Sequence, residues 1–385
     1  MDQNYLGLDQ PTRYPRTSLA VAVEVLVHGP RSRAQLADRM NLSPASLTRL
    51  VKPLIAGGVL IEAEPVRSSA LGRSSLLLDV VDDYRFIGVK LTADTAFAVL
   101  TDLRAQVLDS ASLPLSATTP DDVVRTIQAL VRSLARGATI DGVGITLGGR
   151  VRNGVVVDSP YLGWKQVELR QLASVVLDAP VHVDNDVIGL TNAEHWFGWG
   201  RGFPGFALLT IGAGIGYGLV LGDALVPTET GPVGHLPIDQ GGPVCPSGHR
   251  GCLAAYATVG SITAAASVGH QRTLGFDEVI ALAQEGDLIA TRVLSDAAWA
   301  VGRAASMISD VTSVRRVILS GEAVPLAETA GDSLAAGLNQ YRAVDVPPVD
   351  VVIQPADFFE WARGAAVVAL QREFPRAPGP RAGIE

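Results

Sequence analysis

The sequence predicts an α/β protein in two parts, an N-terminal winged helix-turn-helix domain followed by an internally duplicated α/β domain. Two observations support this prediction. Between Leu19 and Leu54, apolar residues recur at helical spacing and are interrupted by capping and turn residues. Further along, two hairpins of similar sequence begin 120 residues apart, at Phe86 and Phe206, and each is followed by further short apolar strands.

Three helices are expected in the N-terminal part. The first carries apolar residues at i, i+3, i+4, i+7 and i+8 from Leu19 and ends at Gly29-Pro30. Ser32-x-x-Gln35 is a capping box for a short second helix. Ser43 and Pro44 are an N-cap and a first-turn proline for the third helix, which ends near Gly57-Gly58. The order predicts a helix-turn-helix, in which Pro53 bends the last turn.

The outward side chains of the third helix are small, hydroxylated or cationic, as in a helix that enters the major groove of DNA. Strands at 59–61 and 76–78 would flank a basic wing. A helical domain with a solvated cationic face is the alternative to DNA binding. The predicted DNA contacts are Ser43, Ser46, Thr48, Arg49, Lys52, Arg67 and Arg73.

Composition excludes a polyanion-binding chain as a whole, because the formal net charge is -8. The charge is uneven, however. Residues 1–80 hold 9 Lys+Arg against 7 Asp+Glu, whereas the remainder is strongly acidic. The N-terminus lacks the apolar core of a signal peptide, and no apolar run is long enough for a membrane span. Two cysteines in 385 residues favour a reducing compartment, so we expect a soluble, cytoplasmic protein without membrane partners.

Four segments are expected: a DNA-binding domain at 1–80, a first lobe at 81–198, a second lobe at 199–375 and a disordered tail at 376–385. Each lobe would be built from its hairpin, further strands and helices, with an apolar helix at 362–371 closing the second lobe. The strands are expected at 86–91, 96–103, 140–147, 181–183, 206–211, 216–221, 316–319 and 351–353, and long helices at 277–294 and 295–312.

Residues 231–256 contain both cysteines of the chain, Cys245 and Cys252, and the histidines His235 and His249. Cys and His clustered on a loop rich in Gly and Pro suggest a structural zinc site with four N/S ligands. Two reduced, packed cysteines and two hydrogen-bonded histidines are the alternative, and the residues alone do not decide between them.

The same loop carries a family resemblance. Its order Gly234-His235, then Cys245-x-Ser247-Gly248-x-x-Gly251-Cys252, resembles the ROK family (repressors, open reading frames and sugar kinases). The resemblance implies a duplicated actin-like, ribonuclease-H-like fold with a ligand cleft. It also implies a zinc site on His235, Cys245, Ser247 and Cys252. A serine hydroxyl is a poor zinc ligand, so this site is complete only if His249 substitutes for Ser247.

The resemblance also implies a sugar site and a nucleotide site. The sugar site would use Gly148, Asn185, Asp186 and His235, with Asp186 as the catalytic base in kinases and a sugar ligand in repressors. The alternative is a structural role, in which Asn185 or Asp186 simply caps the following helix. Several family residues are replaced: the first phosphate turn falls on Lys90, Thr92-Ala93 and Asp94, an adenosine contact on Ser320-Gly321-Glu322, and two sugar-binding glutamates on Pro232 and Ala254.

Two functions follow from these residues. The preferred one is a transcriptional regulator, most simply a repressor, whose ROK domain senses a sugar or sugar derivative and has lost kinase activity. It would bind operator DNA as a homodimer or a dimer of dimers, would not bind ATP, and would keep Asp186 only as a vestigial base. The alternative is an ATP-dependent sugar kinase. A sensor domain that has degenerated and only dimerises is a third possibility.

Overall fold

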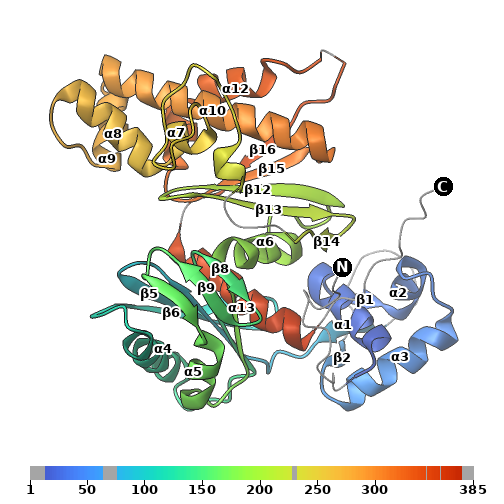
Figure 1. Ribbon diagram of the computed structural model, residues 1–385. Coiled ribbons are helices and arrows are strands. Elements are labelled where there is room, and N and C mark those ends of the chain that lie inside the picture. Colours follow the sequence, from blue (N-terminus) through green and yellow to red (C-terminus); the bar gives the residue numbers. More distant parts are fainter. Residues whose placement is uncertain (1–13, 64–75, 228–231, 344, 356, 375–385) are drawn as a thin grey trace. The chain divides into compact units, whose positions relative to one another are not determined.

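The computed structural model describes residues 14–63, 76–227, 232–343, 345–355 and 357–374 (Figure 1). The chain divides into two compact units. The first unit contains the residues up to Phe197 together with those from Phe358 onwards, and the second contains Gly198–Asp357. Two predicted features, the wing residues Arg67 and Arg73 and the tail at 376–385, lie outside the described residues.

The N-terminal part of the first unit has the predicted order of three helices followed by a hairpin. Its helices are α1 (Arg16–His28), α2 (Arg33–Arg39) and α3 (Pro44–Ala56), and its strands are β1 (Arg31–Ser32), β2 (Leu60–Ala63) and β3 (Leu77–Val80). The three strands form one antiparallel sheet in the order β1-β3-β2.

Both predicted helix caps are confirmed. Ser32 Oγ accepts a hydrogen bond from Gln35 N, and Gln35 Oε1 accepts one from Ser32 N, which is a complete capping box. Ser43 Oγ accepts from Ser46 N at the start of α3, and Pro44 occupies the first turn. The turn between the helices is closed at Asn41, which has a left-handed backbone. Pro53 lies within α3, and the helix continues past it to Ala56.

The N-terminal helices share a core with the rest of the first unit. Apolar residues of α1 and α3 lie in one buried cluster with Leu103, Trp196 and Phe374. Arg104 adds polar contacts to this interface. Its guanidinium donates to the carbonyl of Leu26 at 3.1 Å and pairs with the carboxylate of Asp79. The N-terminal helices and their hairpin therefore pack firmly against the rest of the first unit.

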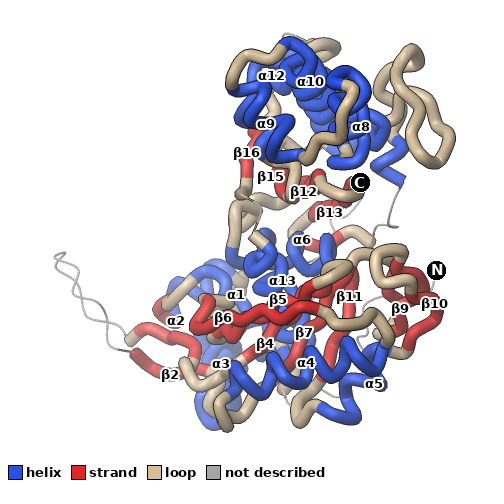
Figure 2. Tube along the Cα trace, turned by 90° about the vertical axis from the view of Figure 1, so that its left-hand side faces the viewer, coloured by secondary structure: helices blue, strands red, loops and turns tan. Residues whose placement is uncertain are grey.

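The remainder of the first unit is a five-stranded sheet in the order β11-β7-β4-β5-β6. Strands β4, β7 and β11 are parallel, and β5 and β6 are antiparallel additions. Helices α4 and α5 cover one face, and α6 and α13 the other (Figure 2). A small sheet of β8, β9 and β10 follows β7. The strands are β4 (Phe86–Leu91), β5 (Thr95–Thr101), β6 (Val107–Pro114), β7 (Gly142–Leu147), β8 (Arg150–Arg152), β9 (Val155–Ser159), β10 (Trp164–Val167) and β11 (Val181–Asn185), and the helices are α4 (Pro120–Ala135), α5 (Leu169–Val176), α6 (Asp186–Phe197) and α13 (Phe358–Glu373).

The C-terminal helix α13 differs from its predicted assignment to the second lobe. It packs against β4, β7 and α6 of the first unit. The contact is very close, because a Cβ at Gly88 would lie 1.9 Å from the carbonyl oxygen of Ala362, and one at Gly144 would lie 1.7 Å from that of Ala365. Glycine on the strands therefore allows this helix to lie directly on the sheet.

The second unit repeats the topology of the first. Its sheet has the order β14-β13-β12-β15-β16, with an antiparallel β12/β13 hairpin and parallel β12, β15 and β16. This order matches β6-β5-β4-β7-β11 strand for strand, so the predicted duplication is confirmed. The strands are β12 (Gly205–Ile211), β13 (Ile215–Leu221), β14 (Ala224–Leu225), β15 (Arg316–Ser320) and β16 (Asp350–Ile353).

The helices of the second unit surround a core rich in Ala, Leu and Val. One predicted boundary is wrong. Instead of two helices divided at residue 294, the first ends at Gln284 and the second runs without interruption from Leu288. Gly286 has a positive φ of 88°, and Asp287 caps the second helix. The helices are η2 (Pro232–His235), α7 (Leu253–Ala257), α8 (Val259–His270), α9 (Phe276–Gln284), α10 (Leu288–Thr312), α11 (Pro325–Thr329) and α12 (Gly331–Asn339).

No helix within the described part of the chain combines the length and the apolar character that crossing a membrane requires.

Candidate metal centre and ligand site

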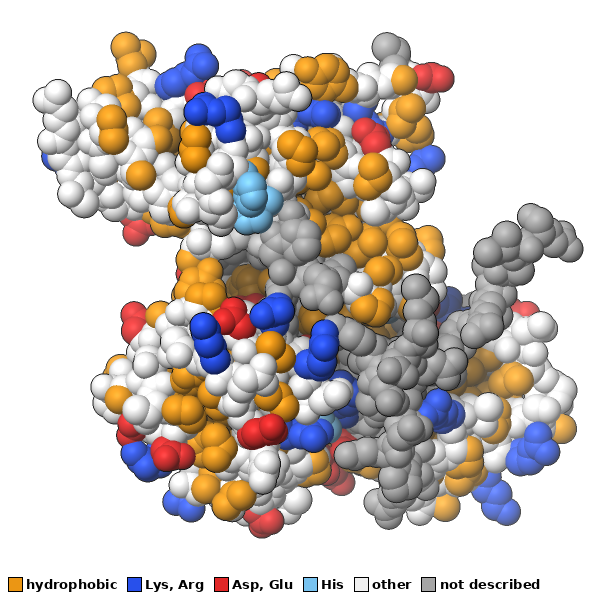
Figure 3. Space-filling model, viewed as in Figure 1, with side chains coloured by type: hydrophobic (Ala, Val, Ile, Leu, Met, Phe, Trp, Pro, Cys, Tyr) orange, Lys and Arg blue, Asp and Glu red, His pale blue; other side chains and the backbone are white. Residues whose placement is uncertain are grey.

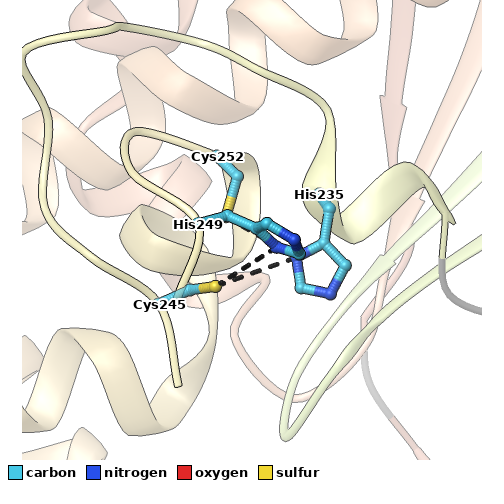
Figure 4. A group of neighbouring side chains, drawn as sticks. All are labelled: His235, Cys245, His249 and Cys252. Carbon is cyan, nitrogen blue, oxygen red and sulfur yellow. Dashed lines mark hydrogen bonds between the residues drawn. The ribbon is translucent and has the colours of Figure 1, made fainter. Parts of the chain in front are cut away.

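The end of η2 and the loop that leads from it to α7 bring the four predicted metal ligands together. Residues 245–249 form a tight turn, in which Cys245 N donates to the carbonyl of His249 at 2.8 Å. The bridge between Pro237 and Cys252 then closes the loop at the start of α7. As a result, the ligand atoms of His235, Cys245, His249 and Cys252 all lie within 4.8 Å of one another (Figure 4).

The separations fit a tetrahedral metal site. Cys245 Sγ lies 3.8 Å from His235 Nδ1 and 3.7 Å from His249 Nδ1, and Cys252 Sγ lies 3.7 Å from His235 Nδ1. In tetrahedral zinc sites, bonds of about 2.3 Å to sulfur and about 2.0 Å to nitrogen place S and N about 3.6 Å apart. Because both cysteines are buried while both histidines are exposed, the site is open to solvent on its histidine side. In Figure 3, pale blue histidine atoms are visible on the surface of the second unit.

The two thiols of the cluster have different acidities. At Cys245, desolvation acts to raise the pKa, but hydrogen bonds from the backbone at His249 and Ser247 and from the Cys252 and Ser247 side chains lower it overall. Burial raises the pKa of the Cys252 thiol, and the neighbouring Cys245 raises it further. The thiolate is the metal-binding form, so a lowered thiol pKa at Cys245 favours the binding of a cation. Ser247 hydrogen-bonds to this thiol and is not one of the four grouped ligands.

In the first unit, Gly148, Asn185 and Asp186 meet at the ends of the parallel strands β7 and β11. Asn185 Nδ2 donates to the carbonyl of Gly149 at 2.8 Å, and its Oδ1 accepts from Val187 N at 2.9 Å. The Asn185 side chain thus caps α6, as the simpler interpretation of this residue expects. A Cβ at Gly148 would lie 2.9 Å from the ring of Tyr161 and 3.6 Å from Asp186 Oδ2.

A buried ion pair that the sequence analysis missed occupies this site. Lys90, on β4, pairs with Asp186 Oδ2, and the two side chains are 7% and 11% exposed. The other carboxylate oxygen, Oδ1, accepts a hydrogen bond from Val187 N at 2.9 Å. The Lys90 ammonium also lies 5.1 Å from the ring centre of Trp361. A lysine inside an otherwise apolar strand is a sequence signal for such a partner, because a buried ammonium needs an anion.

The two hairpin turns that resemble phosphate turns are both occupied by carboxylates. In the first, Asp94 accepts hydrogen bonds from the hydroxyls of Thr92 and Thr95, both at 3.0 Å. In the second, Ala213 N donates to Glu322 Oε2 at 3.2 Å. The second contact was also missed, although Glu322 was noted as a departure from the family pattern. Each carboxylate repels an anionic phosphate at its turn.

The described residues among the predicted DNA contacts lie on α3 or at its start. Ser43, Thr48, Arg49 and Lys52 are exposed, and Ser46 is half-buried. The hydroxyl groups of Ser43 and Thr48 already make hydrogen bonds within the helix, to Ser46 and to the carbonyl of Pro44. Arg49 and Lys52 are therefore the long cationic side chains that the exposed face offers.

A family model matches most of the chain. The model for the ROK family covers residues 86–372, from the first strand of the duplicated domain to the last helix. This chain belongs to the ROK family. The prediction from the Cys and His loop is thereby confirmed, and the ROK domain comprises both five-stranded sheets.

Similar proteins include regulators and kinases. The DNA-binding transcriptional repressor Mlc of Escherichia coli is 26% identical over 323 residues, covering 78% of this chain and 79% of Mlc. The xylose repressor of Bacillus subtilis is 23% identical, covering 77% and 79%. A solved ROK family transcriptional regulator homologous to E. coli Mlc has a TM-score of 0.77 at 22% identity, covering 94% of this chain and 97% of its own. A ROK hexokinase from Thermus thermophilus has a TM-score of 0.64 at 25% identity, covering 75% and 98%.

The edge strand β11 of the first five-stranded sheet carries two titratable side chains, His182 and Asp184, whose pKa values are shifted in opposite directions. Burial, together with the charges of the nearby Arg372 and Arg170, lowers the pKa of His182 to about 4. Burial raises the pKa of Asp184 to about 6, although a hydrogen bond from Asn185 N and the charge of Arg372 act against this. Both residues lie on β11, and His182 Nε2 has no hydrogen-bond partner among the described residues.

The two groups should give opposing pH dependences. The stabilising contribution of neutral His182 is present above about pH 6.5 and is lost as the pH falls toward about 4. The unfavourable contribution of ionised Asp184 is present above about pH 6 and is relieved as the pH falls toward 3.8. We therefore expect Asp184→Asn to lose about 2 kcal/mol of stability from pH 7 to pH 5, and His182→Gln to gain about 1 kcal/mol. Denaturant titrations at both pH values measure this, and equal slopes in the two variants would contradict it.

Proposed function

We propose that this protein is a DNA-binding transcriptional repressor whose ROK domain senses a sugar-type effector and does not act as a kinase. The names of its relatives support this, since Mlc and the xylose repressors are repressors and the N-acetylglucosamine repressor of E. coli is 23% identical. The observation that carries the proposal is the Lys90–Asp186 pair. In this pair, Lys90 binds the carboxylate of Asp186, which a kinase of this family would use as its general base.

A general base must accept the proton of the sugar hydroxyl. Asp186 instead accepts hydrogen bonds from Lys90 and from Val187 N, one at each oxygen. Phosphoryl transfer also needs positioned phosphates, and Asp94 and Glu322 place negative charge on both turns. These contacts support the sensor over a sugar kinase, the alternative function, because they engage the base position and place carboxylates at both phosphate turns of the described residues. Asp186 is proposed as a vestigial base that contacts the effector together with Gly148, Asn185 and His235.

For DNA, we propose that α3 is the recognition helix, with Arg49 as a base contact and Lys52 as a phosphate contact. Ser43, Ser46 and Thr48 complete the proposed surface on α3, and Arg67 and Arg73 would belong to a wing. A homodimer bound to two half-sites is the natural arrangement, because a two-fold axis places two recognition helices about one turn of DNA apart. A cytoplasmic location is part of the same proposal.

The test of DNA readout is Arg49→Ala. We expect it to weaken binding to the protein's own operator by about 1–3 kcal/mol, and binding to random DNA much less, because a base contact contributes mainly to discrimination. Fluorescence anisotropy with both DNAs at two salt concentrations measures this. Arg132→Ala, which removes an exposed arginine of α4, is the matched control and should change neither affinity. Equal losses on both DNAs would reduce Arg49 to a phosphate contact.

For the metal, we propose that His235, Cys245, His249 and Cys252 hold one structural zinc ion. The donor set fits, because two thiols and two imidazoles are a common ligand set for structural zinc. Bound zinc would fix the loop before α7 and the orientation of His235, which is proposed as an effector contact. No ATP is expected as a cofactor.

A further inference from the structure

The ligand site has hydrogen-bond donors in reserve on Lys90. Each oxygen of Asp186 accepts one hydrogen bond, from Lys90 at Oδ2 and from Val187 N at Oδ1. The Lys90 ammonium has three donors, and Asp186 is the one acceptor recorded for it among the described residues. Because the Lys90 side chain is only 7% exposed, water has little access to the remaining donors. A buried ammonium in this state is stabilised by any ligand that brings oxygen acceptors to it.

The surroundings of Lys90 favour a negative charge on that ligand. On one side the ammonium is balanced by Asp186, and on another it faces the ring of Trp361 at 5.1 Å. The Lys90–Asp186 pair has no net charge, so it does not repel a carboxylate as an unpaired Asp186 would. Hydrogen bonds from an ammonium to an anion are roughly twice as strong as neutral ones.

A flat aromatic surface adjoins the pair. The ring of Tyr161 is 47% exposed and lies against Gly148, where a Cβ would come within 2.9 Å of the ring and 3.6 Å of Asp186 Oδ2, so glycine allows the ring to lie beside the pair. An exposed aromatic ring beside a buried charged pair suits a ligand that has both a ring with C–H faces and a charged group.

We propose that the effector is an acidic sugar derivative, with a carboxylate or phosphate group held by Lys90. This inference rests on the proposed function, since it assumes that the ROK domain binds a sugar-type effector. It names the chemical class of that effector and makes Lys90 the residue that determines the charge preference.

The test uses the full-length protein and matched pairs of probes that differ in one acidic group. The pairs are D-glucuronate with D-glucose, D-galacturonate with D-galactose, and D-glucose 6-phosphate with D-glucose. Isothermal titration calorimetry gives the dissociation constant of each. At least one acidic member should bind about tenfold or more tightly than its neutral partner, as expected for one added charge-assisted hydrogen bond. Comparison of the carboxylate and phosphate pairs identifies which acidic group is preferred.

Two variants separate Lys90 from Asp186. Asp186→Asn keeps the ammonium and should keep the preference for the acid, whereas Lys90→Met/Asp186→Asn removes the charge without leaving an unpaired partner and should lose it. Lys165→Met, which removes an exposed lysine on β10, is the control and should bind like the wild type. Circular dichroism establishes that each variant is folded.

The outcomes distinguish this inference from the proposed function. Binding of neutral sugars equal to or tighter than that of their acids would overturn the inference and leave a sugar sensor in place. An acid preference that survives in the double variant would also overturn it. If no member of the panel binds at millimolar concentration, both the inference and the proposed sugar sensing fail.

Discussion

The purified protein is expected to contain about one zinc ion per chain, and His249→Ala and Cys252→Ala are each expected to lose it. The four donor atoms already lie at separations close to those of a tetrahedral site, so removing one leaves three ligands and an open position. Structural zinc contributes of the order of 10 kcal/mol to small metal-bound domains. We therefore expect the loop at 236–252 to become susceptible to protease in both variants. Elemental analysis and limited proteolysis measure the two effects.

The serine between the cysteines provides a sharp control. Ser247 lies next to the Cys245 thiol, at the position where the ROK pattern has a zinc-binding cysteine. Ser247→Cys combined with His249→Ala should therefore regain the zinc that His249→Ala alone loses. Zinc retained in the single variant would show that His249 is not a ligand. A folded wild type free of zinc after growth and purification with added zinc would show that the loop is stabilised by packing alone.

Lys90→Met is expected to destabilise the first unit by about 3–5 kcal/mol, because it leaves the buried Asp186 carboxylate without its cation. Asp186→Asn should cost less, since an amide oxygen still accepts a hydrogen bond from the ammonium. The double variant Lys90→Met/Asp186→Asn should return to within about 1–2 kcal/mol of the wild type, because an apolar or neutral pair avoids the desolvation of two charges.

Equilibrium denaturation of the wild type, the two single variants and the double variant gives the coupling between the two side chains. A coupling energy of about 2 kcal/mol or more is expected from a buried, hydrogen-bonded pair. Lys165→Met, at an exposed position, should change stability by less than about 0.5 kcal/mol and controls for loss of a lysine. If the effects of the two single changes simply add, the side chains do not interact, and Asp186 would again be free to act as a base.

Much of the fold could be predicted from local sequence patterns. The capping box at Ser32, the N-cap at Ser43 and the two hairpins depend on residues close together in the chain, so short-range physics determines them. The grouping of His235, Cys245, His249 and Cys252 was also predictable, because they fall within 18 residues of the chain. The boundary after Gln284 was missed, although Gly286 and Asp287 are a stop and a start signal that the apolar periodicity obscured.

Contacts between distant segments were decided by the tertiary structure alone. In the sequence, Lys90 departs from the family pattern and Asp186 matches it, but the two residues are 96 positions apart. Only the parallel arrangement of β4, β7 and β11 brings them together. Similarly, α13 follows the second unit in the chain but packs on the first, because glycines at 88 and 144 leave room for it there. Sequence alone determined the family, the caps and the grouping of the four Cys and His side chains through local pattern. The pairing of Asp186 with Lys90, on which the proposed function rests, depends on a buried charge that finds its partner across the sheet.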